Sequence, residues 1–183
     1  MSSFHSSLNV KRYFFAFLFL LLLAAVLLGC NSNLGDDQND QGVMPDGLIG
    51  KWVFDSNNWY EIKAPVAPET KHSIIYTAIF SHPEWGDFDF SFEGVIEFVS
   101  NHSSSSGVLI VRYTKAAPDP NKLFTGIYYN NLRNNTVQLA NAWDLANETS
   151  ADTATLDEAI SKFTRDNAAN FVNWTRVSPY NRQ

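Results

Sequence analysis

The chain has 183 residues, and its 13 lysines and arginines against 19 aspartates and glutamates give a net charge of −6. A surplus of acidic groups disfavours contact with polyanions, so no nucleic-acid partner is expected. Cys30 is the single cysteine, which excludes an internal disulfide and a metal site built from several thiolates.

The first residues predict an export signal. Lys11-Arg12 precede an uncharged apolar stretch over residues 13–28, and a basic segment followed by an apolar one is the layout of a secretory signal. As a helix this stretch would reach about 24 Å, short of the roughly 30 Å hydrocarbon core of a bilayer. We therefore expect a cleaved signal in preference to a permanent transmembrane helix.

The end of this stretch, Leu27-Leu28-Gly29-Cys30, resembles the lipobox of bacterial lipoproteins. Leu27, Gly29 and Cys30 occupy the positions of the family's leucine, small residue and invariant cysteine, whereas Leu28 is bulkier than usual. The resemblance implies a diacylglyceryl group on Cys30, cleavage after Gly29 and durable anchoring by two or three acyl chains. Asn31, in place of an inner-membrane aspartate, favours the outer membrane. The alternative is an uncleaved anchor with an incidental cysteine.

The sequence divides into three segments. Residues 1–29 are the predicted signal, and residues 30–46 are the lipidated cysteine with a polar tether that lacks apolar periodicity. Residues 47–183 have the length of one domain. The acidic side chains of the tether, Asp36, Asp37 and Asp40, do not have the spacing of a calcium-binding loop, so we interpret this segment as a solvated spacer.

Short segments rich in aromatic and β-branched residues alternate with turn residues along the domain and predict antiparallel strands. A helix at about residues 153–165 is indicated by a capping box between Thr155 and Glu158 and by an apolar stripe that follows it. The result is a mainly β fold, a small antiparallel β-barrel of about eight strands with one helix before the last strand. The strands are expected over residues 47–54, 59–63, 72–80, 87–99, 108–113, 122–129, 136–140 and 170–177.

The alternation over residues 87–99 is the clearest strand pattern in the chain, with phenylalanines on one face and Gly94 marking a bend. One hypothesis is that these rings line a cavity for a small hydrophobic ligand. The alternative is that they fill the barrel core. The candidate lining residues are Phe88, Phe90, Phe92, Phe98, Tyr113 and Tyr128.

Gly50-Lys51-Trp52 at the start of the domain resembles the Gly-x-Trp motif of lipocalins and their calycin relatives. The resemblance implies an eight-stranded barrel in which Trp52 lies across the closed end and a basic residue near the C-terminus, here Arg176, packs on it. The family's Thr-Asp-Tyr motif has no counterpart, since Ile127-Tyr128-Tyr129-Asn130 is only vaguely similar.

The C-terminal half is also similar to uncharacterised spirochaete lipoproteins. This resemblance implies family membership and no activity. The shared segments are residues 106–113, 128–132, 156–164 and 174–180.

No arrangement of side chains predicts catalysis. The serines that follow His102 sit at a hairpin tip and lack the rigid elbow and oriented base that a nucleophile needs. The carboxylates at 87, 89, 93 and 97 alternate on a polar strand face. His82, Glu84 and Asp87 share one loop region and would make at most a weak Zn²⁺ or Ca²⁺ site. We therefore predict no catalytic residue, no cofactor and no metal.

These observations predict a non-catalytic, membrane-anchored envelope lipoprotein, with its domain periplasmic or surface-exposed, that holds a small hydrophobic ligand in a lipocalin-like barrel. The alternative is a solid β-domain whose loops contact an envelope or host protein, with Trp59, Trp85 and Trp143 as anchors.

Overall fold

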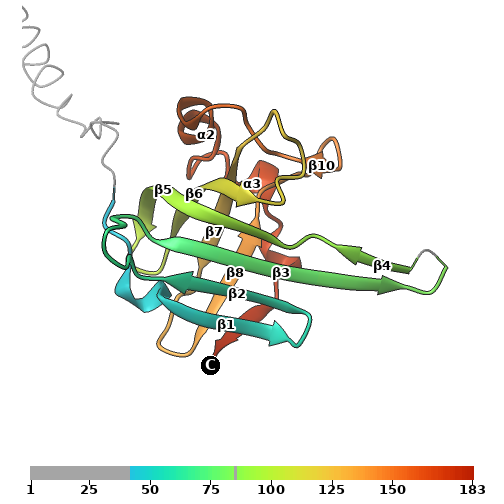
Figure 1. The fold of residues 1–183 in the computed structure, drawn as a ribbon, viewed down its shortest axis with the longest axis horizontal. Helices are drawn as coiled ribbons and strands as arrows, with labels where there is room; N and C mark the ends of the chain where they lie inside the picture. Colours follow the sequence, from blue (N-terminus) through green and yellow to red (C-terminus); the bar gives the residue numbers. More distant parts are fainter. Residues whose placement is uncertain (1–41, 85) are drawn as a thin grey trace, which may run out of the picture. The chain divides into compact units, whose positions relative to one another are not determined.

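The computed structural model describes residues 42–84 and 86–183, which belong to one compact unit (Figure 1). The predicted signal, Cys30 and most of the predicted tether lie outside the described residues. Residues 42–46 were assigned to the tether, yet the side chain of Met44 is buried in the main core. The packed domain therefore begins before the expected start at residue 47.

Eight strands close into an antiparallel barrel, which confirms the predicted fold class. Around the ring they follow the order β1, β2, β3, β5, β6, β7, β8, β11, and β11 closes it by pairing with both β8 and β1. Their bounds are β1 (Gly50–Asp55), β2 (Asn58–Lys63), β3 (Ser73–His82), β5 (Phe92–Ser103), β6 (Ser106–Lys115), β7 (Phe124–Asn130), β8 (Thr136–Asn141) and β11 (Pro179–Arg182).

Three further strands lie outside the ring. β4 (Gly86–Asp89) pairs with the end of β3 that extends beyond the barrel. β9 (Trp143–Asp144) and β10 (Thr149–Ser150) form a separate two-stranded ribbon after β8.

Side chains at every second position of the barrel strands form the main core. On β3, for example, Ile74, Tyr76 and Ala78 are buried and the residues between them are only partly so. Trp52, Leu109 and Ile127 are 0% exposed. Because such side chains touch neither solvent nor an internal space that water could enter, the middle of the barrel is filled.

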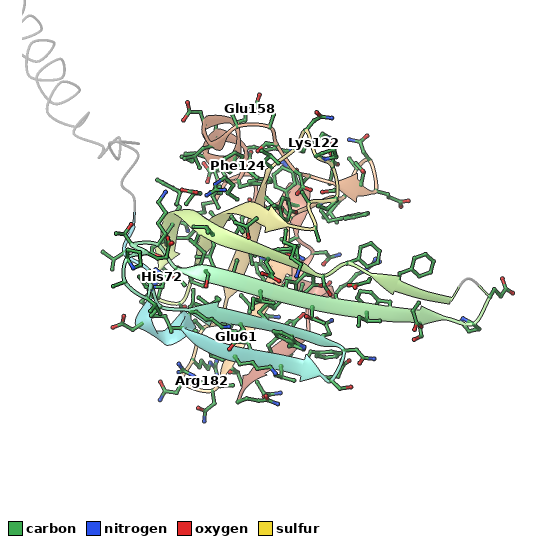
Figure 2. The ribbon with its side chains drawn as sticks, viewed as in Figure 1. Glu61, His72, Lys122, Phe124, Glu158 and Arg182 are labelled. Carbon is green, nitrogen blue, oxygen red and sulfur yellow. The ribbon has the colours of Figure 1, made fainter. Side chains whose placement is uncertain are left out.

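A second, smaller core lies outside the ring and explains why β6 and β7 are buried on both faces. Val108, Ile110 and Tyr128 point outward beneath α2 (Leu156–Lys162) and α3 (Ala168–Phe171). Phe163, which follows α2, packs on the β7 backbone: a Cβ atom at Gly126 would lie 2.7 Å from Phe163 Cγ. Figure 2 shows Glu158 at the outer side of this layer.

The predicted helix is present and its capping box is confirmed. The Thr155 hydroxyl accepts a hydrogen bond from the Glu158 N–H at 3.2 Å, and the Glu158 carboxylate accepts one from the Thr155 N–H at 3.2 Å. These two bonds satisfy N–H groups that a helix start otherwise leaves unpaired. The helix is shorter than the predicted 153–165, and a second short helix, α3, follows it before β11.

The strand predicted over residues 87–99 is present as β4 and β5, which pair with β3 in one continuous register; at the break between them the Phe90 N–H still donates to the Ala78 carbonyl at 2.9 Å. The prediction that its phenylalanines share one face is wrong beyond Ile96. Within β5 a bulge at Glu97 shifts the register, since Ile96 pairs with Val111 but Phe98 pairs with Ile110. An extra residue in one strand reverses which side chains face inward, so Phe98 packs in the outer core.

The last strand predicted at residues 170–177 is also wrong. That segment contains the end of α3 and the 3₁₀ helix η2 (Trp174–Arg176), which Asn173 caps by accepting a hydrogen bond from the Thr175 N–H. Phe171 and Val172 are both buried against the outer core, and two consecutive buried residues do not fit a half-buried strand. The strand that closes the barrel is β11, in which Tyr180 alone is buried.

Candidate ligand-binding site at the open end of the barrel

One end of the barrel is closed by the residues that lead into β1. The 3₁₀ helix η1 (Asp46–Leu48) places Leu48 in the core, and the Trp52 indole N–H donates to the Leu48 carbonyl at 2.8 Å. The Gly42 N–H also donates to the Val99 carbonyl at 2.7 Å. Trp52 is therefore bound to the segment that leads into β1; this end is named the closed end.

The basic residue on this tryptophan is Arg182, in place of the expected Arg176. Its guanidinium carbon lies 5.3 Å from the centre of the Trp52 ring, and the guanidinium donates to the carbonyls of Ile49 and Asn134. Arg176 is exposed in η2. The sequence signal that could have identified Arg182 is its place in the true last strand, two residues after the inward-facing Tyr180.

A continuous chain of aromatic contacts runs inside the barrel towards the end opposite η1, where the β3–β4 arm begins; this end is named the open end. Tyr60 stacks on Tyr76 with ring centres 4.4 Å apart, and Tyr180 meets Tyr60 edge-on at 5.2 Å. Phe92 contacts Tyr76 at 5.4 Å and Tyr113 at 5.0 Å. Such pairs add stabilisation beyond the area they bury, so this aromatic layer forms a firm floor at the open end.

The hydroxyl groups of this floor are bonded to polar side chains near the open end. Tyr60 donates to Asn141 Oδ1 at 3.2 Å, and Tyr180 donates to Asn58 Oδ1 at 2.7 Å. Burial raises the pKa of Tyr76 to about 12 and also raises the pKa of Tyr60 and Tyr180. The phenols are therefore neutral hydrogen-bond donors at any physiological pH.

A buried carboxylate adjoins the floor. Asp152, which is 5% exposed, accepts a hydrogen bond from the Tyr113 hydroxyl at 3.1 Å through Oδ1. Its other oxygen, Oδ2, is buried and has no hydrogen-bond partner within the described part of the chain. Burial and the nearby Asp152 charge raise the pKa of Tyr113.

An arm formed by two strands projects beyond the rest of the barrel (Figure 1). It consists of the last part of β3 and of β4, and it carries Phe80, Phe88 and Phe90, which are 50%, 39% and 56% exposed. Phe80 pairs with Phe88 across the strands, and its ring lies 5.9 Å from that of Phe90. Phe80 follows Tyr76 and Ala78 at two-residue steps, so this face of the arm continues the inner face of the barrel.

The opposite face of the arm carries acidic and hydroxyl groups together with Ile79, which is 37% exposed. Asp87 and Asp89 alternate with the phenylalanines, and the Ser81 hydroxyl donates to Asp87 Oδ1 at 2.6 Å. Hydrogen bonds from Ser91 lower the pKa of the Asp89 carboxyl, so it is charged at neutral pH. The arm is therefore amphipathic, with one aromatic and one acidic face.

The six predicted lining residues fall into three environments. Phe92 and Tyr113 are together in the aromatic floor, Phe88 and Phe90 are together on the arm, and Phe98 and Tyr128 lie in the outer core. The sequence prediction did not include four aromatic residues of this site: Phe80 on the arm, and Tyr60, Tyr76 and Tyr180 in the floor. The alternation along residues 72–80 already places Tyr76 and Phe80 on one face. Tyr180 was missed because it lies beyond the last predicted strand, residues 170–177.

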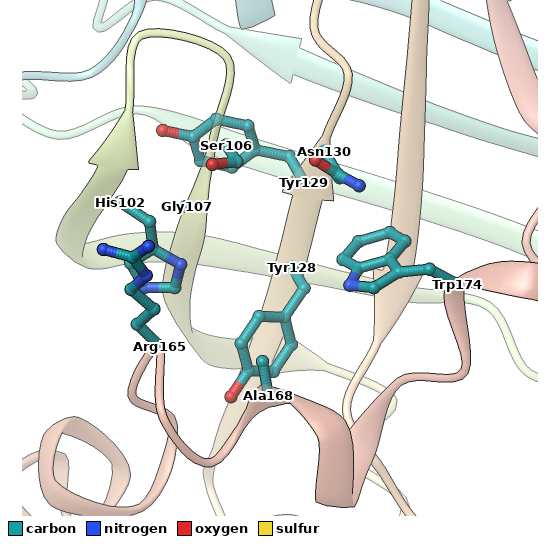
Figure 3. Close-up of a pocket in the computed structure, with 9 residues that line it drawn as sticks. All are labelled: His102, Ser106, Gly107, Tyr128, Tyr129, Asn130, Arg165, Ala168 and Trp174. Atoms are coloured by element: carbon teal, nitrogen blue, oxygen red, sulfur yellow. The ribbon is translucent and has the colours of Figure 1, made fainter.

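A separate shallow pocket of about 180 Å³ lies on the outer wall of the barrel, at its closed-end side (Figure 3). The β5–β6 hairpin, β7 and the segment from α2 to η2 surround it. Side chains of His102, Ser106, Tyr128, Asn130, Arg165 and Trp174 line it. Burial, and then the charge of Arg165, lower the pKa of His102, against a smaller opposing effect of Asp166.

Across residues 42–84 and 86–183, no three or more histidine, aspartate or glutamate side chains are grouped so that they could hold a metal ion. None of the helices in the same ranges has the length and apolar character needed to span a bilayer.

The class of structure is an eight-stranded antiparallel barrel with an internal aromatic layer and an arm that carries exposed phenylalanines. No protein-family model, no curated protein and no solved structure matches this chain.

Proposed function

We propose that this chain is a lipid-anchored, non-catalytic binding protein of the bacterial cell envelope, and that it takes a small apolar ligand at the open end of a lipocalin-like barrel. The ligand would lie on the aromatic floor and against the phenylalanine face of the arm. The middle of the barrel is filled, so the proposed site is at the mouth and is shallower than the cavity that the sequence suggested.

The observation that carries this proposal is the unbroken apolar surface from the core to solvent. Phe80, Phe88 and Phe90 extend the inner face of β3 beyond the barrel and are each at least 39% exposed. Soluble proteins rarely leave aromatic side chains grouped in this way unless something binds them. Fully burying one such ring is worth roughly 1.5–3 kcal/mol, so a ligand that covers two or three would be held firmly.

The proposed lipid anchor rests on the sequence around Cys30. Its test is a Cys30→Ala variant, which should lose the lipid, keep its signal uncleaved and leave the outer-membrane fraction. Mass spectrometry of the N-terminal peptide measures this directly. An unmodified Cys30 in the natural chain would refute the anchor and leave the binding site unaffected.

The ligand proposal is tested with residues 42–183, which contain every strand pairing of the barrel, and with cis-parinaric acid, a fluorescent fatty acid, as the probe. We expect saturable binding. Phe80→Ser with Phe90→Ser should weaken it by at least about tenfold, because two apolar contacts are lost. Val66→Ser, an exposed apolar position in the loop after β2, is the matched control and should bind as the unmodified protein does. Absence of saturable binding, or equal binding by both variants, would refute the proposal.

A second candidate, contact with an envelope or host protein, is favoured by one observation: the described residues pair β4 with β3 alone, so the arm presents an open strand edge. Open edges can accept a strand from another chain. Of the proposed tryptophan anchors, Trp143 is 45% exposed, Trp59 lies under the Lys51 ammonium at 4.5 Å, and Trp85 lies outside the described residues. Loss of a cross-linked partner in the phenylalanine variants, with no probe binding, would favour this function.

A further inference from the structure

We propose that the outer-wall pocket is a second binding site, for a small aromatic carboxylate. It lies on the opposite side of the barrel wall from the core, near the closed end, and shares no lining residue with the open-end site. Its ligand and its test are therefore independent of the function proposed above.

The size and walls of the pocket fit a single ring. A dry cavity of roughly 150 Å³ holds one benzene molecule, and this pocket measures about 180 Å³. Figure 3 shows the Trp174 indole and the Tyr128 ring on the same side of the pocket, beside Asn130 and Ala168. Trp174 is partly buried and offers a face on which a flat ring can stack, whereas Tyr128, which is 1% exposed, forms the base beneath it.

The polar groups of the pocket fit a carboxylate. Arg165 has a planar guanidinium that matches a carboxylate with two parallel hydrogen bonds, and Figure 3 shows it against the His102 imidazole. The side chains that line the pocket include no aspartate or glutamate. In a chain of net charge −6, a concave surface that presents a cation and no carboxylate selects anions.

His102 supplies an unused hydrogen-bonding group. Its Nε2 atom is buried and has no partner within the described residues, and burying such a group unpaired is costly. The imidazole is held neutral by burial and by Arg165, so Nε2 can donate or accept a hydrogen bond according to its tautomer. Because Nε2 is closed to solvent, a carboxylate held by Arg165 would act on the imidazole through its charge. Ser106 and Asn130 at the rim offer further hydrogen bonds.

The experiment uses the full-length protein in a non-ionic detergent, labelled at histidine and followed by NMR during titration with benzoate. We expect the His102 signals to shift in a saturable way. The pKa of His102 should also rise with benzoate bound, because the carboxylate offsets the Arg165 charge that lowers it, while Asp166 already acts in the opposite direction. Arg165→Gln should weaken binding by at least about tenfold. Arg133→Gln, an exposed arginine between β7 and β8, should bind benzoate normally.

Two further probes make the proposal refutable even if Arg165→Gln perturbs the fold. Benzamide has the same ring without the charge, and inorganic phosphate has charge without a ring. We expect neither to produce the saturable shift at concentrations where benzoate does. Equal binding of benzamide would overturn the role of charge, equal binding of phosphate would overturn the role of the ring, and no binding of benzoate would overturn the site. None of these outcomes bears on the open-end ligand.

Discussion

Arg182 and Trp52 are direct partners across β11 and β1, and the guanidinium carbon of Arg182 lies 5.3 Å from the centre of the Trp52 ring. The arginine also donates to the Ile49 carbonyl, which precedes the first strand. One side chain of the last strand therefore holds the first strand, the closing segment and the core tryptophan together. This contact stabilises the closure of the barrel, because β1 and β11 are the first and last strands of the sequence and pair with each other.

Replacing Arg182 with alanine should lower the free energy of unfolding by about 1–2 kcal/mol, the sum of an exposed cation–π contact and one or two hydrogen bonds. Urea denaturation measures the change. Arg176→Ala removes the same charge from an exposed position in η2, and we expect a change of less than about 0.5 kcal/mol. Equal effects of the two substitutions would show that Arg182 contributes charge only.

The packing of α2 on the barrel gives a second prediction. A Cβ atom at Gly126 would lie 2.7 Å from Cγ of Phe163, and Phe163 is buried and cannot move aside without disturbing the outer core. Gly126→Ala should therefore destabilise the protein by about 1–3 kcal/mol through overpacking. Gly47→Ala is the control, because its Cβ would lie 3.4 Å from the end of the Leu132 side chain. A thermal melt of each variant tests this, and a Gly126→Ala variant as stable as Gly47→Ala would contradict it.

The elements that the sequence predicted best are those whose signal is local. The alternation of β3 and the capping box of Thr155 and Glu158 depend on neighbours a few residues away, and both are present. The bulge at Glu97 depends on which residues of β6 lie opposite, so no pattern within 87–99 reveals it. The contact between Arg182 and Trp52 could not be predicted either, because it depends on how β11 pairs with β1, a strand more than 100 residues away in the sequence. For the open-end site, the alternation over residues 87–99 identified Phe88, Phe90 and Phe92, and Tyr113 was added from a neighbouring strand. Phe98 was placed on the wrong face because of the bulge, and Tyr128 because β7 is buried on both faces.

Glu97 predicts a pH dependence of stability. Burial alone would raise the pKa of its carboxyl, but hydrogen bonds and ion pairs with Lys71 and Arg112 outweigh burial and lower it. A carboxyl whose pKa is lower in the folded state stabilises the fold above its unfolded pKa, about 4.3, and this contribution disappears as the pH falls through the folded pKa. The stability difference between the unmodified protein and Glu97→Gln should therefore be constant near neutral pH and shrink below about pH 4.3.

Urea denaturation at a series of pH values measures this difference. Glu69→Gln, in the exposed loop between β2 and β3, is the control and should differ little from the unmodified protein at any pH. A Glu97→Gln difference that stayed the same down to pH 2 would mean that the two ion pairs do not stabilise the fold.

The buried pair Tyr113 and Asp152 gives the last prediction. Tyr113→Phe removes the one hydroxyl that donates to Asp152 Oδ1, while Oδ2 already has no partner in the described residues. The carboxylate would then be buried without this donor, and the free energy of unfolding should fall by about 1–3 kcal/mol.

Replacing both partners with apolar residues removes the unpaired group as well as the bond. The double variant Tyr113→Phe with Asp152→Leu should therefore be more stable than the sum of the two single effects, with a coupling of about 1 kcal/mol or more. Strictly additive effects would mean that the hydrogen bond does not hold the Asp152 segment against the barrel.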